Sequence, residues 1–223
     1  IVKNNLKWFE YDNTSKLLTV STSESIWTVA EALEKDYNND LWHRFIGLPG
    51  SIWWAVFWNA WCFWLETESN FVSCEVYDLS SWEIKIFSKN DMNFTYRDSV
   101  FKQNESYFII NATFDLFIKV EKYSSDVYNI KFREEVQPKW NSCWSFFKNP
   151  SKEHSAWFLI ENVWLKWYFH KNAFFSEKHA NFLMMNVDNW DYNDLLELMK
   201  IAQDKVFLKF WETLENEVRI IKN

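Results

Sequence analysis

The chain has 223 residues, a formal net charge of −7 and a pI of about 5.2. This acidic balance argues against the backbone of a nucleic acid or an anionic membrane surface as a partner. The three cysteines are few and odd in number, so we expect no disulfide framework and a reducing compartment, the cytoplasm. The length suits one large domain or two small ones with real hydrophobic cores.

Glycine and tryptophan occur at unusual frequencies. The chain contains 2 Gly and 16 Trp, whereas average composition would give roughly sixteen glycines in a chain of this length. The two counts look exchanged. Five of the tryptophans fall within GSIWWAVFWNAWCFW, the stretch that begins at Gly50.

The first elements predicted along the chain are a short strand and a helix. Residues Leu17–Thr22, LLTVST, are apolar and β-branched and predict a strand. Residues Thr28–Tyr37 have helical periodicity, with Val29, Leu33 and Tyr37 on one side.

The uncharged run Ile46–Leu65 has the 20 residues that a membrane-spanning helix needs. Pro49, Gly50, Ser51 and Asn59 lie inside it, and its tryptophans are spread through the middle rather than held at two interfacial belts. We therefore expect no membrane span. An aromatic binding surface is also disfavoured, because these indoles would expose a larger apolar patch than soluble monomers tolerate.

Most of the following segments have the pattern of short strands. The first two are joined by SSW, where a hairpin turn asks for glycine and the sequence has Trp82. Strands are predicted over Phe71–Leu79, Glu83–Ser88, Tyr107–Val120 and Val127–Phe132.

The clearest helix is predicted over Tyr192–Phe210. Asp191 is placed to cap its beginning, and Trp211 follows its end, where glycine is usual. Its apolar residues have i, i+3, i+4 spacing: Leu195, Leu198, Met199, Ala202, Val206 and Phe210. Together these elements predict a soluble α+β protein.

Replacing tryptophan by glycine makes a family resemblance visible. Residues 47–66 then read GLPGSIGGAVFGNAGCFGLE, which closely resembles the flavin-binding loop of the MurB family, the UDP-N-acetylenolpyruvoylglucosamine reductases, roughly GIPGSVGGAxxxNxGxxGxE. Five more blocks resemble the family in the same order and carry more specificity than a glycine-rich loop alone. They are FTYRDSVFK from Phe94, NSCWSFFKNP from Asn141, SAWFLIENVWLKWY from Ser155, SEKHANF from Ser176 and LENEVRII from Leu214.

We hypothesise that the source reads UGA as glycine and that the sequence was translated with UGA as tryptophan. Trp27 and Trp42 are left open by this reading. Glycine fits at the other positions: Trp8, Trp53, Trp54, Trp58, Trp61, Trp64, Trp82, Trp140, Trp144, Trp157, Trp164, Trp167, Trp190 and Trp211.

The resemblance implies the domain organisation. Residues 1–118 would be the second half of a PCMH/VAO-type FAD-binding domain, and residues 119–223 the C-terminal α+β substrate-binding domain of the MurB family. The family's N-terminal segment, with its GGGSN-like flavin loop, should precede Val2–Asn5 and has no counterpart here. We therefore expect a fragment that holds FAD less tightly.

The resemblance also implies an activity in peptidoglycan precursor synthesis. NADPH would reduce FAD, and the flavin would pass hydride to the enolpyruvyl double bond of UDP-N-acetylglucosamine enolpyruvate, giving UDP-N-acetylmuramate. Such a reduction leaves carbanion character beside a carboxylate, so it needs a cationic group and a proton donor. By resemblance, Arg97 stabilises the charge, Ser145 protonates the neighbouring carbon and Glu217 assists at the substrate, while Tyr96, Lys148 and Asn149 contact the substrate.

Cofactor contacts are assigned to the loop that follows Ile46. A pyrophosphate needs backbone N–H groups within hydrogen-bonding distance, and residues without Cβ allow that approach, whereas two adjacent indoles would fill the space. The residues assigned to cofactor binding are Gly47, Pro49, Gly50, Ser51, Ile52, Trp53, Trp54 and Asn59.

Taken alone, several of these residues also have plain structural readings. On spacing alone, Arg97 is more simply a surface residue paired with Asp98, and Ser145 a turn or cap residue. Glu217 would then be a solvated carboxylate near Arg219, and Tyr96 a packing residue. His179 and Cys143 have no sequence-adjacent partner that would specify a Cys–His pair, and we interpret His179 as structural.

The remaining expectations concern metals, partners and rival functions. No metal-ligand spacing is present, and a monomer that binds neither nucleic acid nor membrane is expected. Two alternatives stay open: another FAD-dependent oxidoreductase on the same scaffold, or, if the tryptophans are literal, a non-enzymatic Trp-rich membrane-interface protein.

Overall fold

A computed structural model describes residues 5–118, 126–138, 142–186, 188 and 191–220 of the chain. The chain divides into two compact units, Ile1–Ile130 and Lys131–Asn223, and each is described here by itself. The division falls inside helix α5 (Asp126–Val136). The domain boundary predicted after residue 118 adjoins residues 119–125, which lie outside the described residues, and it stays a prediction.

The first unit is built on a five-stranded antiparallel sheet with the order β1-β2-β7-β5-β6. Val20 of β2 pairs with Ala112 of β7, and Val76 of β5 pairs with Ile109, so buried apolar residues meet at the centre of the sheet. The strands are β1 (Phe9–Asp12), β2 (Leu17–Ser21), β5 (Phe71–Asp78), β6 (Glu83–Ser88) and β7 (Tyr107–Asp115). The strands predicted over Leu17–Thr22, Phe71–Leu79 and Glu83–Ser88 are confirmed. The strand predicted over Tyr107–Val120 is confirmed up to Asp115, and β1 was not predicted.

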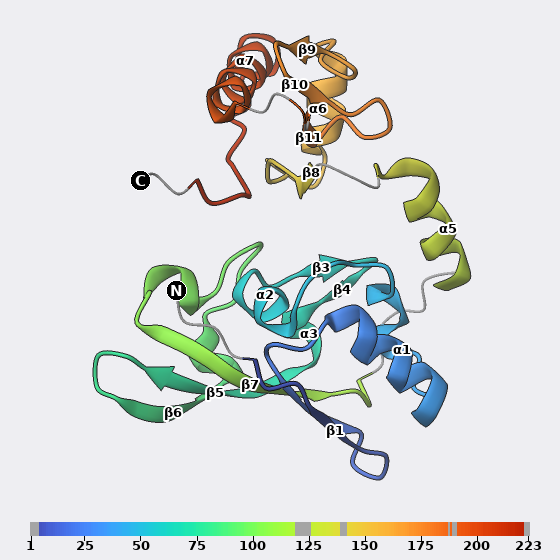
Figure 1. The fold of residues 1–223 in the computed structure, drawn as a ribbon, viewed down its shortest axis with the longest axis vertical. Helices are drawn as coiled ribbons and strands as arrows, with labels where there is room; N and C mark the ends of the chain where they lie inside the picture. Colours follow the sequence, from blue (N-terminus) through green and yellow to red (C-terminus); the bar gives the residue numbers. More distant parts are fainter. Residues whose placement is uncertain (1–4, 119–125, 139–141, 187, 189–190, 221–223) are drawn as a thin grey trace. The chain divides into compact units, whose positions relative to one another are not determined.

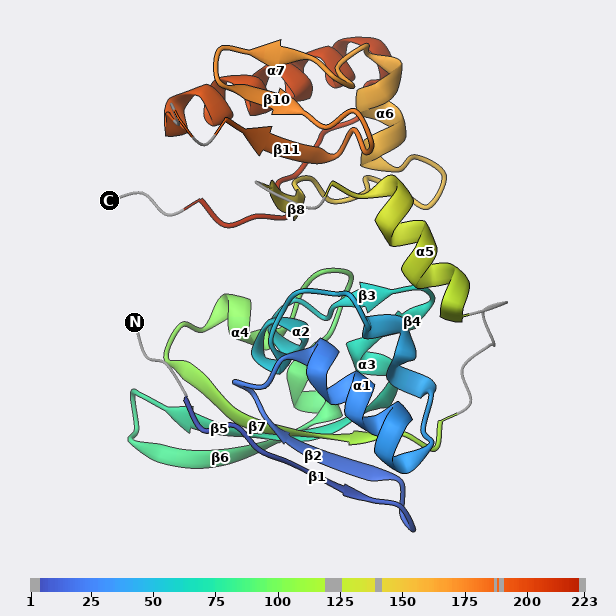
Figure 2. The same cartoon turned by 45° about the vertical axis from the view of Figure 1, so that its right-hand side comes forward.

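Helices cover one face of this sheet. Figures 1 and 2 show α1, α2 and α3 on the same side of it. Helix α1 begins after Ser25, whose hydroxyl accepts the Thr28 N–H at 3.3 Å, and it buries Val29 and Leu33 as predicted. The helical segments are α1 (Ile26–Tyr37), η1 (Leu41–Phe45), α2 (Ile52–Phe57), α3 (Thr67–Asn70), η2 (Lys89–Met92) and α4 (Val100–Gln103), and a small hairpin is formed by β3 (Trp61–Cys62) and β4 (Leu65–Glu66).

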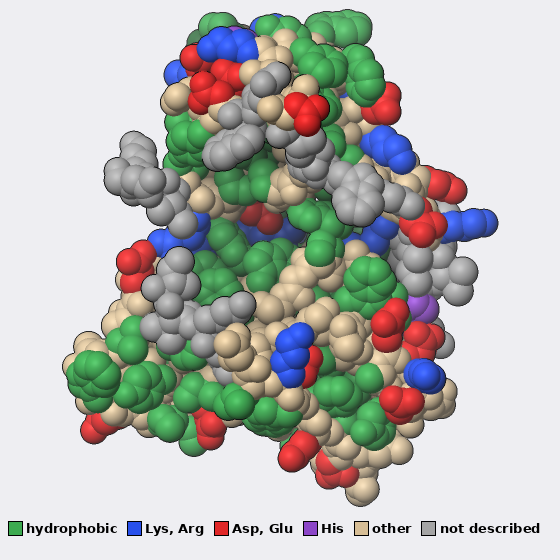
Figure 3. Space-filling model, in the orientation of Figure 1, with side chains coloured by type: hydrophobic (Ala, Val, Ile, Leu, Met, Phe, Trp, Pro, Cys, Tyr) green, Lys and Arg blue, Asp and Glu red, His purple; other side chains and the backbone are tan. Residues whose placement is uncertain are grey.

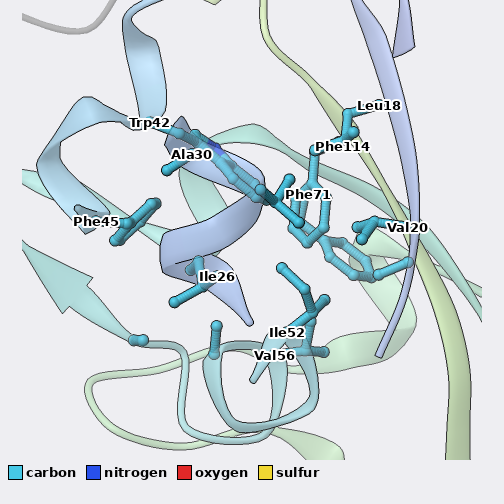
Figure 4. Packing of buried hydrophobic residues seen from close by; sticks show 14 of the residues in the cluster. Leu18, Val20, Ile26, Ala30, Trp42, Phe45, Ile52, Val56, Phe71 and Phe114 are labelled. Carbon is cyan, nitrogen blue, oxygen red and sulfur yellow. The ribbon is translucent and has the colours of Figure 1, made fainter. Parts of the chain in front are cut away.

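A true core tryptophan lies between α1 and the sheet. Trp42 is 1% exposed, and its ring meets Phe45 and Phe114 edge-on with centroids 5.6 and 4.9 Å apart (Figure 4). With the Asn70 amide oxygen turned toward the indole, Trp42 Nε1–H donates to it at 2.7 Å. The Trp42 ring is therefore buried among apolar side chains, and its N–H has a hydrogen-bond acceptor.

The second unit combines a four-stranded antiparallel sheet, ordered β8-β11-β10-β9, with two helices. Helix α7 matches its predicted range, and the Asp191 carboxylate accepts the Asn193 N–H at 2.9 Å at its beginning. Its apolar side packs into a core with α6 and β10. The elements are β8 (Ser142–Ser145), α6 (Ala156–Asn162), β9 (Phe169–His170), β10 (Ala173–Phe175), β11 (Phe182–Met185) and α7 (Tyr192–Phe210).

The strand predicted over Val127–Phe132 is wrong, because these residues lie in α5. Six residues with alternating apolar positions look like a strand in isolation. The segment continues with Arg133, Glu134 and Glu135, which favour a helix over the longer window. The α+β class itself is confirmed.

No described helix is both long and apolar enough to cross a membrane. The uncharged run from Ile46 is divided among α2, β3, β4 and their connections, because its polar and turn-forming residues end each element after a few positions. On the visible face of both units, hydrophobic side chains are interspersed with charged and other side chains (Figure 3).

Candidate functional site

The predicted cofactor loop starts with a turn that requires glycine. Ile46 has φ −61° and ψ 130°, Gly47 has φ 81°, and the Leu48 N–H donates to the Phe45 carbonyl at 2.9 Å. These values define a type II turn, whose third residue needs a positive φ. Gly47 therefore turns the chain from η1 toward α2, and Pro49 follows it on the surface.

The first turn of α2 is fully engaged within the protein. Ser51 caps it by accepting the Trp54 N–H at 3.2 Å, while the N–H groups of Ile52 and Trp53 donate to the carbonyls of Glu24 and Thr22, both at 2.9 Å. These bonds fix α2 against the residues that lead into α1. Ile52 itself is fully buried in the core.

Asn59 joins the predicted cofactor loop to the turn that carries Arg97. It is 2% exposed, its Oδ1 accepts the Glu68 N–H at 2.9 Å, and its Nδ2 donates to the Thr95 carbonyl at 3.2 Å. Because both ends of its amide bind the protein, Asn59 positions these loops, and its assignment to the cofactor stays a prediction.

Tyr96 and Arg97 occupy the tip of a tight turn. Thr95 and Asp98 exchange two main-chain hydrogen bonds, of 3.2 and 3.1 Å, and Arg97 has a positive φ of 57°. The Arg97 guanidinium lies 5.5 Å from the centre of the Tyr96 ring, and Lys102 Nζ donates to the Arg97 carbonyl at 2.9 Å. The structure thus brings together the two residues predicted for charge stabilisation and substrate contact.

In the second unit, Ser145 lies at the end of β8, in a strand with an irregular register. Phe182 pairs with Ser145 and Met184 with Ser142, so β8 contains one extra residue between the paired positions. Trp144, directly before Ser145, has φ 67°. This is a β-bulge, a device that redirects a strand next to functional residues.

A buried asparagine that the sequence analysis missed holds the segment after Ser145. Asn181 is 3% exposed, and its amide both accepts the Phe147 N–H at 3.0 Å and donates to the Phe147 carbonyl at 2.8 Å. Its own carbonyl accepts the Phe146 N–H at 2.9 Å. The available signal was an asparagine between two apolar residues, Ala180 and Phe182, in the block SEKHANF.

The chain near its C-terminal end pairs with the same segment. The Glu217 N–H donates to the Phe146 carbonyl at 2.8 Å, and the Lys148 N–H donates to the Glu215 carbonyl at 2.9 Å. This antiparallel pairing places Glu217 opposite the residue that follows Ser145. Two predicted catalytic residues far apart in the sequence are therefore held in one main-chain arrangement.

The two predicted substrate contacts in this unit have protein partners. Lys148 Nζ lies 3.3 Å from a Glu215 carboxylate oxygen. The Asn149 Oδ1 accepts the Ala156 N–H at 2.9 Å at the start of α6. Both side chains are therefore held within the protein, and their assignment to the substrate stays a prediction.

His179 and Cys143 are unsuited to nucleophilic or base chemistry. The His179 ring packs against Phe182 and Trp157, and its Nδ1 accepts the Asn181 N–H at 3.2 Å. Burial lowers the pKa of His179 to about 4. Cys143 is an exposed residue overall, but partial desolvation of its sulfur and the charge of Glu217 raise the pKa of its thiol to about 11, so the thiol stays protonated at neutral pH. Within the described part of the chain, no cluster of His, Cys, Asp or Glu has a metal-binding arrangement.

The fold identifies the structural class of the protein. A solved structure of UDP-N-acetylenolpyruvylglucosamine reductase from Thermus caldophilus is similar to 94% of this chain, with a TM-score of 0.71 at 22% identity, and the chain covers 73% of that structure. The protein is thus an α+β protein with the MurB fold. The profile of the UDP-N-acetylenolpyruvoylglucosamine reductase C-terminal domain matches residues 137–221.

Curated relatives establish the family. The enzyme of that name from Fusobacterium nucleatum is 30% identical over 213 residues, which cover 95% of this chain and 73% of the relative. The one from Fervidobacterium nodosum is 37% identical over 179 residues, 79% of this chain and 57% of the relative. The chain belongs to the UDP-N-acetylenolpyruvoylglucosamine reductase family. It spans 57% to 60% of the length of three relatives, those from Fervidobacterium nodosum, Thermosipho melanesiensis and Clostridium beijerinckii.

Proposed function

We propose that this protein reduces the enolpyruvyl double bond of UDP-N-acetylglucosamine enolpyruvate to give UDP-N-acetylmuramate for peptidoglycan synthesis. NADPH is the proposed reductant, FAD the proposed cofactor and the cytoplasm the proposed compartment. Family membership supports this proposal. The observation that carries it is the main-chain pairing that holds Glu217 beside the segment following Ser145.

The proposed chemistry of the protein's own residues follows from the bond that is reduced. Saturating a carbon–carbon double bond adds one hydride and one proton, and the proton must come from an acid next to the substrate. Ser145 is proposed as that acid. A hydroxyl is a weak acid unless its alkoxide is stabilised, and Lys148, three residues further on, supplies a positive charge on the same segment.

Arg97 and Glu217 are proposed to act on the substrate itself. Arg97 would balance the negative charge that develops beside the substrate carboxylate, and its tight turn holds its backbone in a defined position. Glu217 would orient the reacting group, since its own main chain is fixed by the hydrogen bond to Phe146. Tyr96 would contact the substrate next to Arg97.

The side chains as written do not fit a flavin pyrophosphate at the loop assigned to it. An ideal Cβ on Gly50 would lie 2.8 Å from the Trp54 ring, so the space beside Gly50 is filled by an indole. The N–H groups of Ile52, Trp53 and Trp54 already donate to protein oxygens. The residues proposed to hold FAD therefore rest on the resemblance, and glycine at positions 53 and 54 would be needed to free this space.

The deciding experiment is a turnover assay with the full gene product, made with glycine at the fourteen positions given above. Substrate-dependent NADPH oxidation with formation of UDP-N-acetylmuramate is expected. If NADPH is oxidised at the same rate with and without the enolpyruvyl substrate, the protein is instead another FAD-dependent oxidoreductase. If the purified protein binds no flavin and gives no turnover, the enzymatic proposal is rejected.

A further inference from the structure

We infer that six positions written as tryptophan are glycine in the protein that its source makes, and that Trp42 is a true tryptophan. The six are Trp64, Trp82, Trp144, Trp164, Trp167 and Trp211. The inference rests on backbone conformation and burial and does not depend on the proposed function.

Tryptophan is concentrated at left-handed backbone positions. Among the described residues, thirteen non-glycine residues have a positive φ, and six of them are tryptophan, although the whole chain has only 16 Trp in 223 residues. Side chains with a Cβ are disfavoured there, and the few that recur are mainly Asn and Asp. Glycine is the residue that adopts this region without strain.

Two of the six lie in hairpin turns of the first unit. Cys62 pairs with Leu65, so Phe63 and Trp64 form a two-residue loop with φ values of 44° and 67°. Positive φ at both loop positions is the type I′ turn, which typically has Asn-Gly. Trp82 ends the four-residue loop between Asp78 and Glu83 with φ 60°, and its N–H donates to the Asp78 carbonyl at 2.8 Å.

Two more occupy a bulge and a turn in the second unit. Trp144, with φ 67°, is in the β8 bulge, where a left-handed residue is usually glycine. Trp167, with φ 60°, is the third residue of a turn closed by a 3.0 Å bond from the Tyr168 N–H to the Leu165 carbonyl. A positive φ at that place is typical of a type II turn and again calls for glycine.

The last two end helices. After α6, the Trp164 N–H donates to the Glu161 carbonyl at 3.0 Å and the Leu165 N–H to the Ile160 carbonyl at 3.2 Å, with Trp164 at φ 61°. This pair of bonds is the Schellman motif, whose left-handed residue is usually glycine. Trp211 ends α7 at φ 60°, and its N–H donates to the Phe207 carbonyl at 2.9 Å.

Burial offers little to offset the backbone strain at five of the six positions, whereas Trp144 is half-buried beside Phe182. The exposed fraction is 64% for Trp64, 74% for Trp82, 85% for Trp164 and 80% for Trp211. A tryptophan that stays in solvent gains little from the hydrophobic effect, which is its main stabilising contribution. The same exposed rings would otherwise suggest an aromatic docking surface, and glycine at these positions removes it.

Two other tryptophans set the contrast. Trp42 is buried, has aromatic neighbours and an acceptor for its N–H, and has no positive φ. Trp27 is 42% exposed but lies inside α1, where glycine would weaken the helix. Exposure alone therefore does not distinguish the six tryptophans from Trp27, whereas a positive φ distinguishes them from both Trp27 and Trp42.

The first test determines the residues directly. Peptide mass spectrometry of the protein taken from its source should show glycine at all six positions and tryptophan at position 42. The gene should have TGA at the six codons and TGG at codon 42. An indole mass or a TGG codon at the six positions would overturn the inference, and TGA at codon 42 would overturn its second half.

The second test measures stability in the chain as written. Trp164→Gly and Trp211→Gly should each raise the Tm of the second unit by roughly 4–8 °C, the shift expected when left-handed backbone strain is relieved in a unit of fewer than about 100 residues. Trp27→Gly is the matched control, being exposed but helical, and should lower the Tm by a similar amount. A fall in Tm for both Trp164→Gly and Trp211→Gly would contradict the inference.

Discussion

Each unit holds its predicted site segment with a buried asparagine, but the two side chains do so differently. Asn59 connects two separate loops, accepting from Glu68 and donating to Thr95. Asn181 binds both polar groups of a single residue, Phe147. Asn59 also has a positive φ of 42°, so it serves as a turn residue as well as a connector.

The difference shows two ways of fixing irregular backbone. In the first unit, the site loops depend on positive φ values at Gly47, Asn59 and Arg97, and the Asn59 amide ties its own loop to the turn that carries Arg97. In the second unit, Asn181 and the pairing with Glu217 act like neighbouring strands and complete the hydrogen bonds of the segment after β8. Buried backbone groups need such partners, because leaving them unpaired costs about 1–3 kcal/mol each.

The largest expected effect is on chemistry in the second unit. Ser145→Ala should lower kcat by about 10²- to 10⁴-fold, the contribution of a positioned general acid, and leave the Tm unchanged. The measurement is turnover of the glycine-containing full gene product. Ser142→Ala on the same strand is the control and should keep its activity. A fully active Ser145→Ala enzyme would reject the assignment of the acid.

Loss of the Asn181 amide should be the largest effect on stability. Asn181→Ala leaves the Phe147 N–H and carbonyl without their partners, and we expect the free energy of unfolding to fall by about 2–4 kcal/mol. Urea denaturation measures this change. Asn186→Ala, which removes an exposed side-chain bond to the Asp188 N–H, should change it by about 0.5 kcal/mol or less. Equal effects of the two variants would mean that Asn181 has no special role.

A pH titration should affect the same segment through His179, whose Nδ1 accepts the Asn181 N–H. Burial lowers the folded-state pKa of His179 to about 4 from an ordinary value of 6.5. The unfolded state therefore takes up a proton first as the pH falls. The stabilising effect of a neutral His179 is fully present above pH 6.5 and is lost progressively between pH 6.5 and pH 4. Between pH 7 and pH 5 this amounts to about 2 kcal/mol.

Unfolding curves at a series of pH values measure that loss. His179→Gln keeps an acceptor for the Asn181 N–H but does not titrate, so the difference in stability between the variant and the parent protein should vary with pH. A difference that stays constant from pH 7 to pH 5 would show that His179 does not control the pH dependence.

The smallest expected effect is a difference in stability between two variants of Asn59, which isolates the contribution of backbone conformation from that of the side-chain hydrogen bonds. Asn59→Gly and Asn59→Ala both lose the amide, but only glycine adopts the positive φ without strain. Asn59→Ala should therefore be less stable than Asn59→Gly by about 1 kcal/mol. Urea denaturation of the two variants gives this difference, and equal stabilities would show that the backbone relaxes at this position.

The sequence predicts those elements whose residue pattern lies within one continuous segment. Helix α7 was predicted with its exact cap because its apolar spacing and Asp191 are contained in one segment. Strands β5 and β6 were predicted for the same reason. The six residues Val127–Phe132 are too short a window: alone they predict a strand, whereas the longer segment forms helix α5.

The arrangement of the candidate site was beyond local patterns. Asn59 was assigned to a cofactor, but its hydrogen bonds go to residues 68 and 95, which no spacing rule connects. The pairing of Glu217 with Phe146 likewise joins distant segments. By contrast, the excess of tryptophan in turns could be anticipated, because turn chemistry requires glycine at particular positions whatever the rest of the fold is.

The bulge in β8 sets the phase of the side chains along that strand. In a regular strand, residues alternate between the two faces, and residues paired across strands share a face, so the bulge lets Ser142 and Ser145 lie on one face although they are three positions apart. The extra residue lies between Ser142 and Ser145. Without the bulge, an odd separation of three positions would place Ser145 on the face opposite to Ser142. The extra residue therefore fixes the side of the sheet on which the proposed acid lies.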